Sequence, residues 1–140
     1  MLIDEIKKAN VQAMKDRDAN KRAIFSVLIT KYNNLAIELK AAGKETTDAD
    51  LLNIIHKTVK ELEDEAKSYL QAGRDEKASE IAQQMVYISM YLPKQLTETE
   101  IKEIIDKLED KSIPSVMKHF KANYAGSVDM SLVSKVARGA

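Results

Sequence analysis

The sequence predicts an all-α protein made of two helical bodies. Apolar residues recur at steps of three and four along most of the chain, which is the periodicity of amphipathic helices. No run of alternating β-branched residues is present, and only four glycines and two prolines interrupt the 140 residues. Pro93 divides the pattern, because proline ends a helix and disfavours helical geometry in the residue before it. We therefore expect an N-terminal bundle of about four helices over residues 1–93 and a small three-helix domain over residues 94–140.

The predicted N-terminal bundle consists of four amphipathic stretches, over residues 2–14, 20–43, 47–73 and 75–91. We place Val11 at the edge of the first buried stripe and Val27 within the second. Asn20 is the expected N-cap of the second stretch, and Thr47 or Asp48 caps the third, because their side-chain oxygens accept hydrogen bonds from free backbone amides. The short connections between these stretches favour antiparallel neighbours.

Three shorter helices make up the predicted C-terminal domain. Thr97 and Glu100 form a capping-box pattern, in which each side chain reaches the backbone amide of the other residue. Pro114 fits the first turn of the next helix, where its missing N–H breaks no hydrogen bond. The polar residues that follow Pro93 are not expected to pack. The other start and stop signals are Ser112, Gly126, and either Ser127 or Asp129.

Composition limits the chemistry that the chain can perform. The absence of cysteine excludes disulfides, thiolate nucleophiles and cysteine-based metal sites, and it favours a reducing compartment. The sequence contains no glycine-rich phosphate loop and no metal-binding histidine pair, so we expect no cofactor and no metal. No apolar run approaches ~18 residues, and the N-terminus lacks the apolar segment of a signal peptide. We therefore expect a cytoplasmic protein with no membrane partner.

Charge is balanced over the whole chain but uneven along it. There are 22 basic and 22 acidic residues, which argues against general nucleic-acid binding because such proteins usually carry a basic excess. Residues 112–140, however, hold four basic residues and one acidic residue, a local charge of +3. This segment is therefore where contact with phosphate is expected.

The same segment supplies a candidate phosphate-binding surface. Lysine side chains would surround a phosphate that approaches the backbone at Gly126 and the N-terminus of the last helix. Each feature also has a purely structural explanation, with Gly126 as a helix stop, Asp129 as a helix cap and His119 as an ordinary surface residue. No catalytic residue is expected. The candidate RNA-binding residues are Lys118, His119, Lys121, Gly126, Lys135 and Arg138.

Four short motifs in this order resemble the GatB/YqeY family across nearly the whole chain. The first two are Ala-Met-Lys-Asp-Arg-Asp at residues 13–18 and Tyr-Leu-Gln-Ala-Gly-Arg at residues 69–74. The third is Tyr-Leu-Pro at residues 91–93, and the fourth is Gly126 followed by Asp129 and Val133. Each motif alone is weak, but the order and spacing of all four make the resemblance specific.

This resemblance implies a two-body helical fold and a relation to the C-terminal helical and tail region of the B subunit of the tRNA-dependent amidotransferase. In that enzyme the tail contacts tRNA, and the chemistry belongs to another domain. The leading hypothesis is therefore a non-catalytic module that binds tRNA, or another structured RNA, through its C-terminal domain. The alternative is a helical adaptor that binds a protein partner without RNA. A third hypothesis is carbon–nitrogen ligase activity with glutamine as amido donor, a label inherited from the larger relative.

Overall fold

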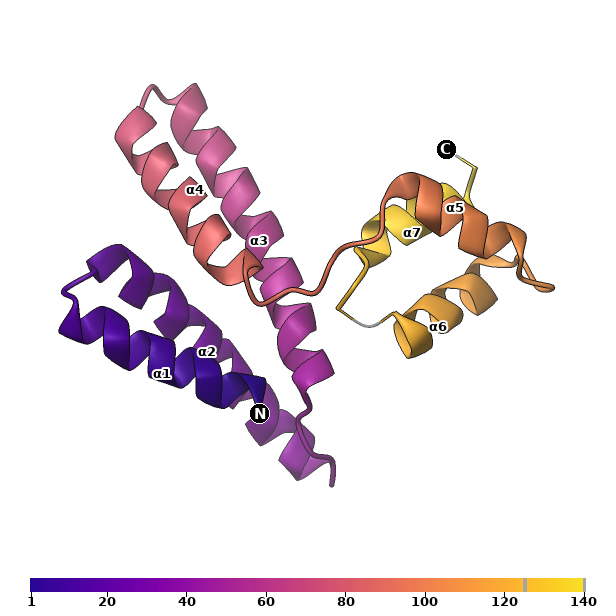
Figure 1. Cartoon of the computed structure of the whole chain (residues 1–140), viewed down its shortest axis with the longest axis horizontal. Coiled ribbons are helices and arrows are strands. Elements are labelled where there is room, and N and C mark those ends of the chain that lie inside the picture. Colours follow the sequence, from indigo (N-terminus) through magenta and orange to yellow (C-terminus); the bar gives the residue numbers. More distant parts are fainter. Residues whose placement is uncertain (125, 140) are drawn as a thin grey trace. The chain divides into compact units, whose positions relative to one another are not determined.

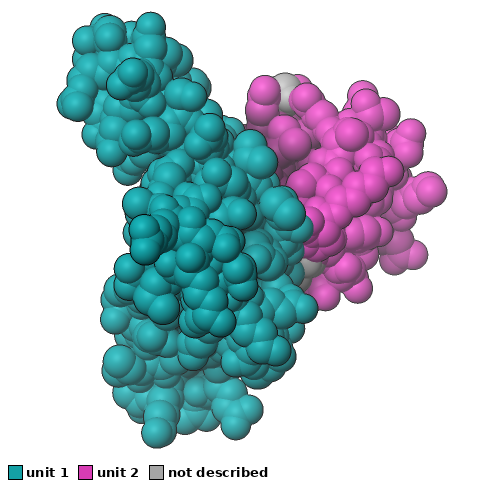
Figure 2. Space-filling view, turned by 60° about the vertical axis from the view of Figure 1, so that its left-hand side comes forward, with its two compact units in different colours: residues 1–91 teal, residues 92–140 magenta. Residues whose placement is uncertain are grey.

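The computed structural model describes residues 1–124 and 126–139 of the chain. These residues form seven α-helices and no β-strand, which confirms the all-α prediction. The chain divides into two compact units, Met1–Tyr91 (unit 1) and Leu92–Ala140 (unit 2), coloured separately in Figure 2. This division is compatible with the predicted domains 1–93 and 94–140. No helix of the described residues is long and apolar enough to cross a membrane.

Unit 1 consists of two antiparallel helical hairpins (Figure 1). The first hairpin contains α1 and α2, and the second contains α3 and α4. The turns that close the two hairpins lie apart from each other in Figure 1. The four helices are α1 (Leu2–Lys15), α2 (Ala19–Ala41), α3 (Asp48–Gln71) and α4 (Asp75–Ser89).

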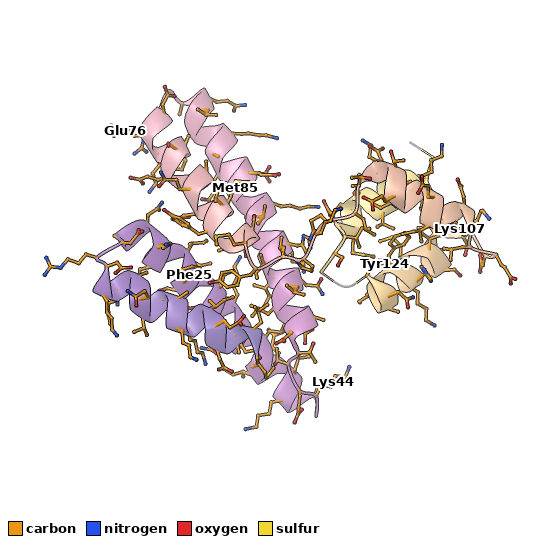
Figure 3. The ribbon with its side chains drawn as sticks, in the orientation of Figure 1. Phe25, Lys44, Glu76, Met85, Lys107 and Tyr124 are labelled. Atoms are coloured by element: carbon orange, nitrogen blue, oxygen red, sulfur yellow. The ribbon has the colours of Figure 1, made fainter. Side chains whose placement is uncertain are left out.

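The hairpins of unit 1 share an aliphatic core. Burying each large aliphatic side chain stabilises the fold by roughly 1.5–3 kcal/mol relative to leaving it in water. Phe25 of α2 adds an edge-to-face contact with Tyr91, with 6.2 Å between the ring centroids (Phe25 is labelled in Figure 3). The fully buried core residues of unit 1 include Ile6, Leu28, Leu51, Ile55 and Ile88.

A polar contact also joins α2 to α3. The Nζ atom of Lys31 donates to Thr58 Oγ1 at 3.0 Å and to Glu61 Oε2 at 2.8 Å. Thr58 is 2% exposed, and its hydroxyl donates to the carbonyl of Ile54 at 2.8 Å. The buried hydroxyl is therefore satisfied, and Lys31 can occupy a position in an otherwise apolar stripe.

The start of α2 differs from the prediction. Its N-cap is Asp18, whose carboxylate accepts a hydrogen bond from the amide of Lys21 at 3.1 Å. Asn20 lies in the first turn instead, and its side chain bonds to α4. It donates to the carbonyl of Glu80 at 3.0 Å and accepts from Gln84 Nε2 at 2.8 Å. The prediction of Asn20 as the N-cap was therefore wrong, because a contact with another helix takes up its side chain.

Two valines that were predicted to be buried are exposed. Val11 of α1 is 47% exposed and Val27 of α2 is 41% exposed. Phe25 and Tyr32 are buried, so the face of α2 that carries these two rings packs against the core. Val27 lies outside this face and is therefore exposed. The prediction of burial for Val11 and Val27 was wrong, and both side chains leave apolar surface on the first hairpin.

Unit 2 contains three shorter helices around its own apolar core. These helices are α5 (Glu98–Asp106), α6 (Ile113–Asn123) and α7 (Met130–Ala137). Phe120 of α6 and Val133 of α7 are fully buried, and Ile101 of α5 packs in the same cluster. The core residues of unit 2 are Ile101, Ile105, Val116, Phe120, Val128 and Val133.

Local signals begin the helices of unit 2 largely as predicted. Thr97 Oγ1 accepts from the amide of Glu100, and Glu100 Oε1 accepts from the amide of Thr97, both at 3.2 Å. This confirms the capping box. Asp129, one of the two predicted alternatives, is the N-cap of α7.

Asp110 takes part in the start of α6. Ser112 holds the N-cap position and Pro114 lies in the first turn, but the Ser112 side chain makes no capping hydrogen bond. Asp110 accepts from Ser115 Oγ at 2.7 Å and from the amide of Ser112 at 2.9 Å. These hydrogen bonds favour the charged form of Asp110 and lower its pKa to about 2. The bond from Ser115 has the largest effect.

Candidate nucleic-acid interface

Four basic residues of unit 2 are exposed on α6 and at α7. Lys118 and Lys121 lie on α6, three residues apart and therefore on neighbouring positions of its surface. Lys135 lies in the last turn of α7, and Arg138 is its C-cap. None of the four has a carboxylate partner among the described residues. Their positive charge is therefore available to a ligand.

A shallow groove of about 450 Å³ brings part of this set together. Lys135 and Arg138 line it together with Met117 of α6. Lys121 lies one turn beyond Met117 on the same side of α6, but it does not line the groove. Arg138 Nη2 donates to Ser134 Oγ at 2.8 Å, which orients the guanidinium at the groove. The other lining residues are Met130, Ser131 and Ser134.

His119 is held within an aromatic cluster. Its ring lies 5.8 Å from that of Phe120 and 6.1 Å from that of Tyr124, measured between centroids. Asn123 Nδ2 lies 3.3 Å from His119 Nδ1. Two positions along an α-helix differ by about 200°, so His119 faces away from Met117 and the groove. Its contacts favour the structural explanation over contact with RNA.

Gly126 is buried rather than open to a phosphate. Its φ angle of 77° lies in the left-handed region, as expected for a residue that follows a helix end. Gln95 Nε2 donates to the Gly126 carbonyl at 2.8 Å, and the amide of Leu96 donates to the Ser127 carbonyl at 2.8 Å. The residues after Pro93 therefore do pack, contrary to expectation, because they supply donors to this loop.

The N-terminus of α7 is occupied by a carboxylate of the chain itself. Asp129 Oδ1 accepts from the amide of Ser131 at 2.9 Å. A carboxylate at this position complements the positive end of the helix dipole and repels an approaching phosphate. Any phosphate contact of this unit therefore depends on the basic side chains and not on the backbone of the 126–129 segment.

The structure thus brings Lys135 and Arg138 together at one groove, whereas Lys118, Lys121, His119 and Gly126 do not line it. Sequence reasoning missed the apolar and hydroxyl-bearing residues that line the groove, because only the packing of α6 on α7 places them together. One indication of this groove was present in the sequence, the i, i+4 spacing that allows Ser134 to contact Arg138 at α7. Among residues 1–124 and 126–139, no group of three or more histidine, aspartate or glutamate side chains could hold a metal ion.

Together these features define a small all-α protein of two helical units, with exposed basic side chains on the last two helices. The chain belongs to the YqeY-like protein family, whose family model matches residues 3–140. A comparison with curated proteins found no match.

Proposed function

We propose that this YqeY-like protein is a cytoplasmic, non-catalytic module that binds tRNA, or another structured RNA, through α6 and α7. The observation that carries the proposal is the set of four exposed basic side chains without carboxylate partners among the described residues. The one acidic residue of segment 112–140 is Asp129, which caps α7. The resemblance to the tail region of the amidotransferase B subunit supports the same partner.

The geometry favours phosphate contact more than base recognition. Lysine and arginine side chains that neutralise phosphates release condensed counterions, which makes binding strongly dependent on salt. Arg138 is held by Ser134, so its planar guanidinium can meet a phosphate with part of its donor set already oriented. Three or four cations neutralise only a few phosphates, so the binding should be weak and should follow the shape of the RNA backbone.

The experiment is a fluorescence anisotropy titration of labelled tRNA with the full chain at two salt concentrations. We expect the triple variant Lys118→Ala, Lys121→Ala, Lys135→Ala to bind at least about tenfold more weakly than the wild type at low salt. The matched control is Lys94→Ala, Lys102→Ala, Lys107→Ala, which removes the same charge from the same unit. Identical curves for the wild type and the first variant would contradict the proposal. Equal losses in both triple variants would show a general charge effect and would also contradict it.

A further inference from the structure

The turn between α1 and α2 ends a helix with an unusual residue. Arg17 has a φ angle of 57°, and it is the one non-glycine residue with positive φ among the described residues. Gly43, Gly73 and Gly139 adopt φ angles of 75–77° after α2, α3 and α7. Glycine adopts this left-handed conformation freely, whereas a side chain makes it unfavourable. Arg17 therefore stands where the chain otherwise uses glycine.

The hydrogen bonds of the turn require this conformation. The amide of Arg17 donates to the Met14 carbonyl at 3.2 Å, and the amide of Asp18 donates to the Ala13 carbonyl at 2.9 Å. The same pattern closes α3, where the amide of Gly73 donates to Leu70. Glycine would satisfy the turn before α2 equally well, so backbone geometry does not explain an arginine at this position.

Contacts within the protein do not explain it either. The side chains of Arg17 and Arg22 are exposed, and neither has a hydrogen-bond, ion-pair or ring partner among residues 1–124 and 126–139. A residue in an unfavourable conformation that gains no internal contact is a candidate for a role in binding. The surroundings of the two arginines indicate the kind of ligand.

Both arginines line an open groove of about 620 Å³ on the first hairpin. Its floor is formed by small side chains, including Ala19 and Ala23, and by Met14, which is 49% exposed. Asp18 also lines the groove, but its carboxylate caps α2. The groove is therefore mostly apolar, and two arginine side chains line it.

Apolar surface continues from this groove along both helices. Val11 lies one turn before Met14 on α1, and Val27 lies one turn after Ala23 on α2. Both valines are more than 40% exposed. An exposed apolar strip between two helices, with small residues that allow close approach, is the surface that an amphipathic helix recognises.

We propose that the α1–α2 groove binds an amphipathic helix of a partner protein, with acidic residues of that helix paired to Arg17 and Arg22. Arginine is suited to this role because its planar guanidinium pairs with a carboxylate through two parallel hydrogen bonds. Charge complementarity therefore selects an acidic partner, and the apolar strip buries the other face of its helix. This site lies on unit 1 and does not rest on the RNA-binding proposal for unit 2.

RNA is the less suitable ligand for this groove. Residues 15–22 carry four basic and two acidic side chains, a net charge of +2, so positive charge alone does not distinguish an acidic helix from RNA. The exposed alanines and valines match an apolar side-chain stripe better than a sugar–phosphate backbone. A short RNA nevertheless serves as the alternative ligand in the test.

The test is a titration of the ¹⁵N-labelled full chain, followed by NMR, with a synthetic helical peptide of about 14 residues. The peptide carries a leucine stripe and two glutamates at one end, and the control peptide carries glutamines in their place. We expect the glutamate peptide, titrated to about 1 mM, to shift amides within residues 11–27 and to bind at least about fivefold more tightly than the control. The double variant Arg17→Gly, Arg22→Gln should lose this difference, whereas Lys7→Gln, Lys8→Gln should keep it.

A second measurement separates binding from folding. We expect Arg17→Gly alone to raise the Tm by about 2–5 °C, because glycine removes the unfavourable conformation. The proposal is overturned if the peptide causes no shifts within residues 11–27, or if loss of both arginines leaves its affinity unchanged. It is also overturned if a short single-stranded RNA gives the same shifts and competes with the peptide.

Discussion

The α1–α2 groove and the α6–α7 groove are alike in form but differ in their charge. Each is an open depression beside two helices, of about 620 Å³ and 450 Å³ respectively, and each has basic side chains along it. The first combines Arg17 and Arg22 with alanines and with Asp18. The second combines Lys135 and Arg138 with methionines and serines, in a segment whose net charge is +3.

This difference shows how two similar surfaces can select different partners. An excess of cations without internal partners attracts a polyanion over a distance, so the α6–α7 surface suits RNA. Two arginines beside an apolar surface can each pair with a carboxylate while the apolar surface packs against side chains, so the α1–α2 groove suits an acidic amphipathic helix.

Salt should separate the two surfaces most strongly. If about three phosphates are neutralised at α6–α7, RNA affinity should fall roughly 40-fold between 50 and 200 mM salt. Peptide binding at α1–α2 should change far less, because apolar contact supplies most of it. Titrations of the two ligands at both salt concentrations measure the two slopes. Similar salt dependences for RNA and for the peptide would contradict the distinction between an RNA-binding and a helix-binding groove.

Gly73→Ala measures the effect of a side chain at a left-handed helix stop. Gly73 has a φ angle of 75°, and a Cβ atom there would meet nothing within 4 Å. The substitution should therefore act through backbone conformation alone and lower the free energy of unfolding by about 1–2 kcal/mol. Urea denaturation measures this loss. An unchanged stability would show that such a stop tolerates side chains freely, and Arg17 would then need no special explanation.

Asp18→Ala should have a smaller effect on stability. The change removes the hydrogen bond from the Lys21 amide that begins α2, at a loss of about 1 kcal/mol. Asp18→Asn is the control, because asparagine also serves as an N-cap. RNA affinity should not change in either variant, since Asp18 lies on unit 1. A rise in RNA affinity with the fold intact would instead place RNA at the α1–α2 groove, because the substitution removes a carboxylate that repels phosphate.

Much of the fold could be predicted because its signals are local. The capping residues Thr47, one of two predicted alternatives, and Thr97 depend only on neighbouring residues, and both are confirmed. Asn20 and Val27 were misplaced because their positions depend on other helices. Asn20 bonds to α4, and the burial of Phe25 and its neighbours turns Val27 outward.

The candidate site was less predictable for the same reason. Local charge indicated a segment whose four basic residues are exposed, and two of them, Lys135 and Arg138, line one groove. The Gly126 carbonyl accepts a hydrogen bond from Gln95, which is distant in the sequence, so local signals could not show that Gly126 faces the protein. The left-handed conformation of Arg17 was also hidden, because arginine gives no sign of the φ angle that a glycine would have suggested.

NMR mapping of tRNA on the ¹⁵N-labelled full chain tests the central claim most directly. We expect tRNA to shift or broaden amides of α6 and α7, including those of Lys121, Lys135 and Arg138, and to leave residues 11–27 unchanged. Changes confined to the α1–α2 hairpin, or no changes anywhere at low salt, would contradict it.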